Sequence, residues 1–482
     1  MSENNTTKSM KKGARDNSRL GTLPIKTLLR QFAVPSIIAL LVSSIYNIVD
    51  QFFIGHSVGI LGNAATNVAF PLVTICTSLS LLCGIGAAAN FNLAMGRKNT
   101  EKAQLVAGNV ITLILICGVT LMIITRIFLT PLLTLFGAIG DVMHYAKIYT
   151  SITSLGFPFL IFTVAGSNMV RADGAPVYSM VCTLVGAILN VILDPIFIFG
   201  FDMGMAGAAW ATVIGQVVSS IMVAIHFMRF RTVKIGLRDM RPQLRVFGDI
   251  AKLGIGSFIN QIAIVFVQVT FNNLIVYHGP RSIYGADIPL AATGIILKIN
   301  MIVFSIIIGI AQGLQPIFSF NYGAENYDRV RKALKTGATL AFFIGLTATF
   351  FFQLFPRQII GAFGTGSELY FEYAVRMFRI FLLLTSLNGF LPIFMNFFSS
   401  IGRAQKAVFM SLSRQLIFFI PLALLFTRIW GLKGLIYTAP VADFISFVVG
   451  ITLITTEMRK MRKLEQAKEE RLLTAASAAA DQ

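Results

Sequence analysis

The chain has 482 residues, of which 55% are hydrophobic and only 13% are charged. Soluble globular domains usually contain about 25% charged residues, so this composition excludes a soluble globular protein. The apolar residues fall into roughly twelve segments, each long enough to cross a bilayer as a helix. We therefore predict an all-α polytopic membrane protein. The alternating pattern of outer-membrane strands is absent from the sequence, which excludes a pore of that type.

The formal net charge is +19, from 40 Lys and Arg residues against 21 Asp and Glu. In a soluble protein this excess would favour a nucleic-acid partner. Here most basic residues lie in the two terminal segments and in the loops on the same side of the membrane. Short cytoplasmic loops are enriched in Lys and Arg, so we expect both termini in the cytoplasm and no nucleic-acid partner.

The first predicted elements are a tail and a polar-faced span. Residues 1–24 are polar and lack the apolar core of a signal peptide, so we expect a disordered cytoplasmic tail. In the first span, over about 28–54, Pro35 is expected to kink the helix. Asp50 lies near the end of this span, with Tyr46 one turn earlier on the same face. We interpret Asp50 as facing a cavity, and the alternative is an interfacial carboxylate.

A turn with the sequence RADGAP follows three further spans. Those spans are predicted over residues 62–90, 104–125 and 143–170. Gly174 permits a sharp reversal and Pro176 begins the next helix. We expect a cytoplasmic hinge, in which Arg171 and Asp173 pair with each other or contact the opposite lobe.

The fifth span, over about 177–199, carries an acid in an apolar environment. Asn190 and Asp194 are four residues apart and so share one helical face. Pro195 leaves the carbonyl oxygen of Val191 without its helical donor. Oxygen ligands of this kind suit a proton or a small cation, so we favour a functional role. The alternative is a structural Asp held by a backbone or Arg partner.

The rest of the chain comprises a sixth span, a linker and a second half. We divide the sequence into an N-lobe over 25–230, a cytoplasmic linker over 231–246, a C-lobe over 247–458 and a cytoplasmic tail over 459–482. The spans of the second half are predicted over 248–277, 289–320, 330–355, 369–398, 404–426 and 432–456. Lys298 lies inside the span over 289–320. Its side chain could extend to the membrane surface or take part in substrate gating, and both interpretations are kept. Arg414 and Asp443 are expected to pair across neighbouring helices.

The two halves repeat short motifs at a constant offset of 227 residues. The matched residues are Ala64, Ala65 and Thr66 with Ala291, Ala292 and Thr293, Gly96 and Asn99 with Gly323 and Asn326, and Gly204 and Gly207 with Gly431 and Gly434. Six spans followed by six in the same order predict two six-helix lobes related by a pseudo-two-fold axis normal to the membrane. Transporters commonly place substrate between such lobes.

Several motifs resemble one family. The segments IYNIVDQFFIG, RADGAP, NVILDPIFIFGFDMGMAGAAWAT, GAENYDRVRKA and GRAQKAV are similar to those of multidrug and toxic compound extrusion (MATE) transporters, most of all the MepA-like and DinF-like bacterial branch. The resemblance extends from about residue 28 to residue 456. It implies the MATE/MOP-type fold and a monomeric antiporter of the bacterial inner membrane, surrounded by lipid. Such a protein would export small organic, often cationic, compounds in exchange for H⁺ or Na⁺.

The resemblance also implies residue roles. It places the coupling cation in the N-lobe, with Na⁺ at Asp50 and Asp194 as one possibility. The cation-coupling residues carried over are Asp50, Tyr46, Asn190, Asp194, Thr212 and Asn168. Pro35 matches the family's first-span proline, and the residues themselves assign Pro195, Arg171, Asp173 and Gly174 to hinges and gates. Lys298, Met301 and Gln312 are expected to line the substrate cleft.

Other classes of function fit the sequence less well. A flippase of the same superfamily, moving a lipid-linked or anionic substrate, would need several basic residues in the cleft, and Lys298 alone gives it little support. An intramembrane enzyme would need a nucleophile–base pair or clustered metal ligands, and no HExxH, GxSxG or Cys/His cluster occurs in the sequence. An ion channel would not need titratable acids. We therefore expect a transporter without enzymatic activity, resident metal or cofactor.

Overall fold

The computed structural model describes residues 19–362 and 366–480, and the regular structure of these residues is helical. The N-lobe elements are α2 (Ile25–Ser57), α3 (Ile60–Gly96), α4 (Thr100–Ile127), α5 (Leu129–Leu135), α6 (Gly140–Thr153), η1 (Ser154–Gly156), α7 (Phe157–Ala172), α8 (Pro176–Pro195), η2 (Ile196–Gly200) and α9 (Gly204–Met228). The C-lobe elements are α10 (Leu244–His278), η3 (Gly279–Arg281), α11 (Asp287–Gly323), α12 (Tyr327–Leu354), α13 (Pro356–Gly361), α14 (Glu368–Phe381), α15 (Thr385–Asn388), α16 (Phe390–Ser400), α17 (Ala404–Leu412), η4 (Ser413–Phe419), α18 (Ile420–Trp430) and α19 (Leu432–Ala480).

The predicted fold class, with twelve transmembrane helices, is confirmed. Among the described residues, 11 helical stretches are long and apolar enough to cross a membrane singly. A twelfth span results when α14 is joined to the stretch Thr385–Ser400, which is bent by 46° relative to it. The sequence predicted one unbroken helix there. The fourth span is also composite, because α6, η1 and α7 follow one another without a gap.

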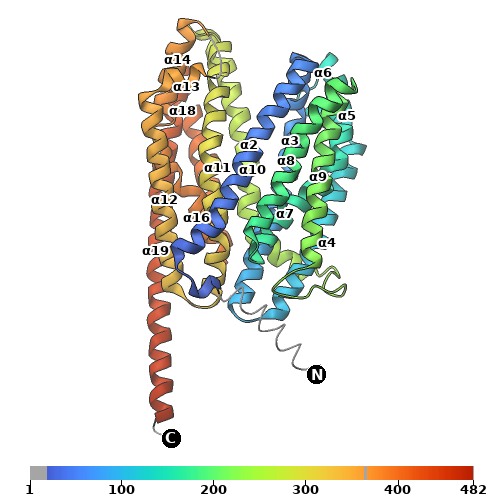
Figure 1. Ribbon diagram of the computed structural model, residues 1–482. Coiled ribbons are helices and arrows are strands. Elements are labelled where there is room, and N and C mark those ends of the chain that lie inside the picture. Colours follow the sequence, from blue (N-terminus) through green and yellow to red (C-terminus); the bar gives the residue numbers. More distant parts are fainter. Residues whose placement is uncertain (1–18, 363–365, 481–482) are drawn as a thin grey trace.

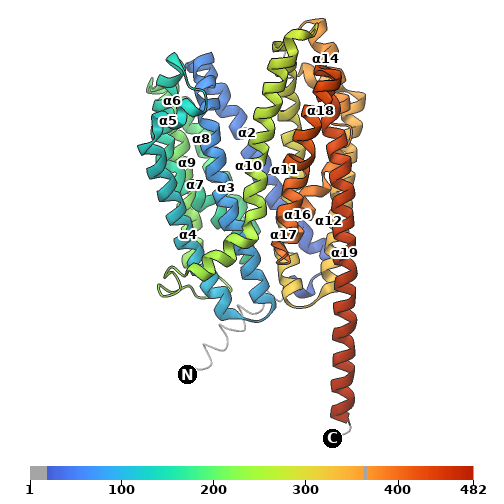
Figure 2. The same cartoon turned by 180° about the vertical axis from the view of Figure 1, so that it is seen from behind.

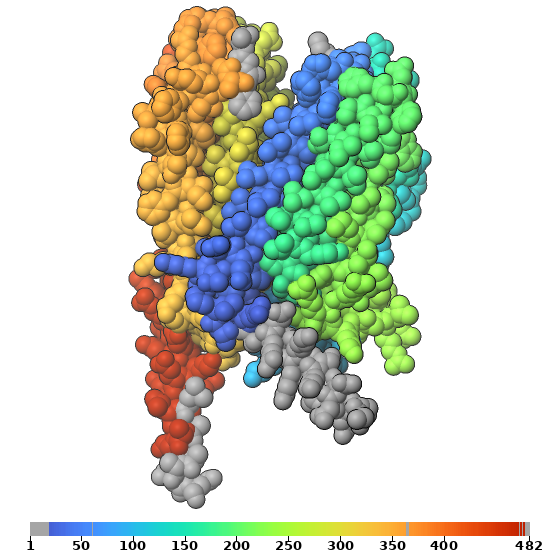
Figure 3. Space-filling model, viewed as in Figure 1, coloured from blue at the N-terminus to red at the C-terminus, as the bar shows by residue number. Residues whose placement is uncertain are grey.

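The helices form two bundles that meet at one end and diverge at the other (Figures 1 and 2). The blue-to-green bundle contains α2 to α9, and the yellow-to-red bundle contains α10 to α19. Helix α2 begins and helix α19 ends on the side where the bundles meet. At the opposite end a furrow separates the two bundles on the molecular surface (Figure 3).

The sequence repeat is also a repeat of backbone conformation. Lys98 and Glu325, which are 227 residues apart, both have φ of 58°, a value that non-glycine residues rarely adopt. Gly204 and Gly431, at the same offset, have φ of 52° and 58°. The matched glycines therefore occupy equivalent helix starts, where a left-handed residue precedes or opens the last span of each lobe.

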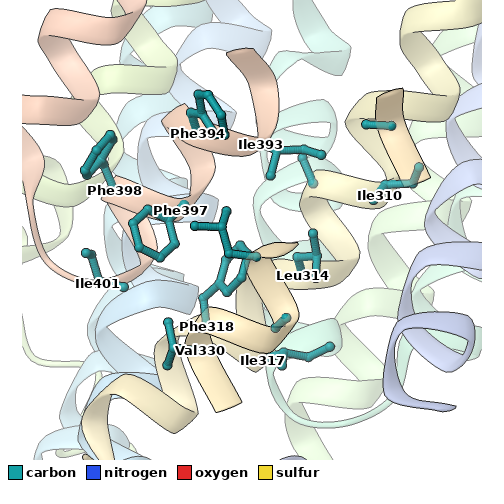
Figure 4. Packing of buried hydrophobic residues seen from close by; sticks show 14 of the residues in the cluster. Ile310, Leu314, Ile317, Phe318, Val330, Ile393, Phe394, Phe397, Phe398 and Ile401 are labelled. Atoms are coloured by element: carbon teal, nitrogen blue, oxygen red, sulfur yellow. The ribbon is translucent and has the colours of Figure 1, made fainter. Parts of the chain in front are cut away.

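The first helix of the N-lobe contributes to the core of the C-lobe. In that core, aromatic rings of α16 pack against aliphatic side chains of α11 (Figure 4). The rings of Phe318 and Phe397 meet edge to face, with centroids 5.3 Å apart. Leu28, Leu29 and Phe32 of α2 belong to the same buried cluster, and each is at most 5% exposed. The start of α2 is thus anchored in the opposite lobe.

Glycines bring the lobes into backbone contact at the end where they meet. Gly86 of α3 packs on the carbonyl of Ile250 in α10, and Gly254 of α10 packs on the carbonyl of Leu82 in α3. A side chain at either glycine would separate these two helices. Small residues have the same use in membrane helix pairs, where they let backbones approach closely.

The symmetry-related contact joins α2 and α11. Gly313 of α11 packs against the backbone of Ala33, and farther along the hydroxyl groups of Ser44 and Ser305 are 2.8 Å apart. Gln315 of α11 donates to the carbonyl of Ile85 in α3 at 2.9 Å. Each lobe therefore presents its second helix to the first helix of the other.

The ends of the chain differ from the sequence-based expectation. Residues 1–18 of the expected tail lie outside the described residues, but Leu20 is buried and its carbonyl accepts from Asn321 and Arg329 of the C-lobe. At the other end, α19 continues as one helix to Ala480, through the segment that was assigned to a cytoplasmic tail. Glu465 of this extension pairs with Arg331 at 2.5 Å. Residues 481–482 lie outside the described range.

The close packing of α3 and α10 predicts that Gly254→Ala destabilises the protein. The added methyl would overlap the Leu82 carbonyl, and overpacking of this kind costs about 1–3 kcal/mol. Unfolding in detergent, titrated with dodecyl sulfate, measures the loss. Gly248→Ala in the same helix is the control, because a methyl there meets nothing within 4 Å. Equal unfolding midpoints for the two variants would contradict this packing.

Candidate functional site

Asp50 of α2 and Asp194 of α8 lie side by side in the N-lobe. Asp50 is 9% exposed and Asp194 is fully buried, and their carboxyl groups are close enough to influence each other electrostatically. Two carboxylates are both acceptors, so a bond between them requires a proton, and without one they repel each other. The pair is therefore a place where a proton or another cation is stabilising.

The polar groups around the pair supply more acceptors than donors. The Asn190 side-chain nitrogen donates to Asp194 Oδ1 at 3.3 Å and to Thr212 Oγ1 at 3.2 Å. Asp50 Oδ1, Asn190 Oδ1 and Asp194 Oδ2 are buried and have no hydrogen-bond partner in the described part of the chain. Buried oxygens without a donor are costly, and a bound cation would satisfy them.

Two tyrosines complete the cluster. Tyr46, one turn before Asp50 on α2, lies close to both carboxyl groups, as the family resemblance implied. Tyr149 of α6 also lies close to Asp50, Asp194, Tyr46 and Thr212. Tyr149 was not among the residues predicted from the sequence. Tyr145, Tyr149 and Thr153 recur at four-residue spacing in the fourth span, and this polar stripe was the available signal.

Asn168 does not belong to this cluster. Its Oδ1 accepts from Arg171 at 2.7 Å, and its nitrogen donates to the carbonyl of Val164 at 2.8 Å. Arg171 also donates to Ser179, in the first turns of α8, at 3.0 Å. Asp194 is fifteen residues farther along that helix, or about 22 Å at 1.5 Å per residue. Asn168 thus holds Arg171 in place near the turn between α7 and α8.

The RADGAP turn reverses at Gly174, as expected, with φ of 83°, and Pro176 begins α8. The expected pairing of Arg171 with Asp173 is not formed. Asp173 is fully buried and accepts from the ring of His226 at 2.9 Å, from the backbone of Arg231 and Thr232 at 2.9 and 3.0 Å, and from the Thr232 hydroxyl at 2.7 Å. It binds the turn to the linker of its own lobe, because those groups are the donors within reach.

Other residues bridge the lobes at this end. Lys102 lies 3.1 Å from the carboxylate of Asp249, and Asn90 donates to the backbone carbonyl of the same residue at 2.8 Å. On the symmetry-related side, Arg329 donates to the carbonyl of Leu23 at 2.6 Å. These contacts were not predicted from the sequence, because charged residues near loops form no pattern that identifies their partners.

The predicted hinge prolines lie within helices. Pro35 is buried, and α2 continues through it as one element. Pro195 ends α8, and the chain changes there to the π-helical turn η2. Single π-turns are rare and occur often at functional sites. Hinge motion at either proline stays a prediction.

Helix α11 carries the three residues that were expected to line the cleft. Lys298 and Met301 are exposed and Gln312 is half-buried. All three share a helical face with Ser305, whose hydroxyl meets Ser44 of α2. This face points toward the N-lobe, and Lys298 and Met301 lie on it beyond the point where the lobes touch. Elsewhere in the C-lobe, the expected pair of Arg414 and Asp443 is formed at 2.7 Å.

The burial of Asp173 predicts that Asp173→Ala loosens the linker. Four donors, from His226, Arg231 and Thr232, would lose their acceptor, and unsatisfied buried groups cost about 1–3 kcal/mol each. Trypsin should cleave after Arg231 faster in the variant than in the parent protein. Asp141→Ala, at an exposed helix start, is the control. Unchanged cleavage kinetics for Asp173→Ala would contradict the anchoring role.

Comparison with known proteins identifies relatives over nearly the whole chain. Multidrug export protein MepA of Staphylococcus aureus is 26% identical over 435 residues, which cover 89% of this chain and 94% of that protein. MepA of Staphylococcus saprophyticus is 26% identical over 431 residues, with coverage of 88% and 92%.

Solved transporter structures share the fold. A MOP superfamily transporter from Pyrococcus furiosus has a TM-score of 0.86 at 24% identity, over 92% of this chain and 98% of that one. A MATE structure in the bent conformation has a TM-score of 0.85 at 24% identity, over 94% and 98%. The family model MatE matches residues 35–196 and 258–425, which include Asp50 and Asp194. Because this match spans well over half of the sequence, the chain belongs to the MatE family.

Proposed function

We propose that this protein exports organic compounds by exchanging them for a cation that binds at Asp50 and Asp194. One observation carries the proposal. Two buried carboxyl groups face each other with unsatisfied oxygens, and one of them is on a helix anchored in the opposite lobe. The similarity to proteins named multidrug export protein MepA supports an export function.

The exchange follows from the position of Asp50. A cation between Asp50 and Asp194 relieves their repulsion and draws α2 toward α8. Without the cation the two helices separate, and α2 transmits this change to α11, against which it packs. The furrow between the lobes is bounded by these helices, so the occupancy of the cation site alters the affinity for substrate. The coupling is reciprocal, as antiport requires.

We favour the proton as the coupling ion and lipophilic organic cations as the substrates. Two facing carboxyl groups can share one proton without further ligands, whereas a metal cation needs several oxygens at once. Aromatic and Met side chains adapt to ligands of varied shape and attract cations, and the exposed Met301 lies toward the furrow. The charge distribution supports a cytoplasmic position for both termini, so export runs away from that side.

Transport into proteoliposomes tests the coupling site. With sodium absent, an imposed pH gradient should drive a lipophilic cationic dye across the membrane in the direction opposite to the proton flux. Asp50→Asn and Asp194→Asn should each reduce this movement to the level of empty liposomes, because neither variant can cycle a proton through the pair. Asp287→Asn, at the exposed start of α11, is the matched control and should transport normally.

Two results would contradict the proposal. Transport that needs a sodium gradient and does not respond to the pH gradient would show that the coupling ion is sodium instead of a proton. Normal coupling in both Asn variants would show that Asp50 and Asp194 do not form the coupling site.

A further inference from the structure

A groove crosses the boundary between the lobes at the end where they meet. It lies between the start of α2 and helix α12, encloses about 210 Å³, and is lined by Lys26, Leu29, Arg30, Ala33, Val34, Ile37 and Leu340. Helix α2 belongs to the N-lobe and α12 to the C-lobe, and both views of the ribbon place them side by side (Figures 1 and 2). A molecule in this groove would touch both lobes at once.

The groove has a charged rim and an apolar floor. Lys26 and Arg30 are one helical turn apart, exposed, and without an acidic partner among the described residues. Farther from the helix start, the lining consists of aliphatic side chains. Val34 and Leu340 are 45% and 38% exposed although they lie in membrane-spanning helices. The order from rim to floor is therefore two cations followed by hydrocarbon.

This order matches an anionic phospholipid in one orientation. Lys and Arg at the end of a membrane span lie at the level of the headgroups, where they attract phosphate. The aliphatic floor then lies at the level of the acyl chains. Asp328, the acid in the first turn of α12, is already paired with Lys332 at 2.7 Å, so it does not neutralise the rim.

We propose that this groove binds an anionic phospholipid of the leaflet on the side of the chain termini, and that the lipid stabilises the closed contact between the lobes. Beside the groove, Ala33 packs on Gly313 of α11 and Ile37 packs on Gly309. A lipid held by Lys26 and Arg30 covers this contact from the membrane side. Movement of α2 away from α12 widens the groove and releases the lipid.

Native mass spectrometry of the full chain tests the binding. The protein is extracted from nanodiscs that contain equimolar phosphatidylglycerol and phosphatidylcholine, and the retained lipid is identified. The parent protein should retain phosphatidylglycerol in preference. Lys26→Gln with Arg30→Gln should weaken retention by roughly 30-fold, because each cation is worth about fivefold toward an anionic lipid. Lys335→Gln with Lys460→Gln removes two exposed charges from the same end and should change little.

A second variant distinguishes binding in the groove from attraction of lipid to surface charge alone. Leu340→Trp would fill the apolar floor while both cations remain, and it should also lose phosphatidylglycerol. Thermal unfolding of each variant checks that the fold is kept. The proposal is wrong if the double Gln variant retains phosphatidylglycerol as well as its control does. It is also wrong if the parent protein retains phosphatidylcholine equally, or if Leu340→Trp retains as much lipid as the parent.

Discussion

Helix α2 is held by both lobes, and the rest of the structure depends on this arrangement. Its first turns, with Leu28 and Phe32, are buried in the core of the C-lobe. Its last turns carry Asp50, which faces Asp194 of the N-lobe. Two like charges at such short range cost a few kcal/mol, which is similar to the roughly 1–3 kcal/mol of typical coupling between sites. A change of charge at Asp50 can therefore alter the contact between the lobes without any other connecting element.

The lobes are alike in backbone but differ in chemistry. Helices α3 and α10 exchange backbone contacts through Gly86 and Gly254, and the related pair α2 and α11 does so through Gly313. Yet the residue that matches Asp194 at the offset of 227 is Pro421, so the buried acid of α8 has no equivalent in the C-lobe. The proposed cation site therefore acts on only one of the two related contacts between the lobes, the contact of α2 with α11.

The helices, their repeat and the residues that share a helical face could be predicted from the sequence. Span lengths and the 227-residue offset predict the helices and their repeat, and the four-residue spacing puts Asn190 and Asp194 on one face. Periodicity does not reveal which helices are neighbours, so the proximity of Asp50 to Asp194 was expected only from the family resemblance. The partners of Asp173 lie 53 to 59 residues away in sequence, and no short pattern encodes such a contact. Asn168 was placed in the cluster only through the family resemblance, whereas its side-chain oxygen accepts from Arg171, three residues along the same helix.

A proton shared by Asp50 and Asp194 should leave the protein when a cationic substrate binds. Binding of a cationic dye to the purified protein, in weakly buffered detergent and without sodium, should release protons. The release should be absent in Asp194→Asn, although the dye still binds. A pH-sensitive electrode or indicator measures the protons, and fluorescence anisotropy measures the dye. Dye binding that releases no protons from the parent protein, or equal release from Asp194→Asn, would contradict a proton shared by these two carboxyl groups.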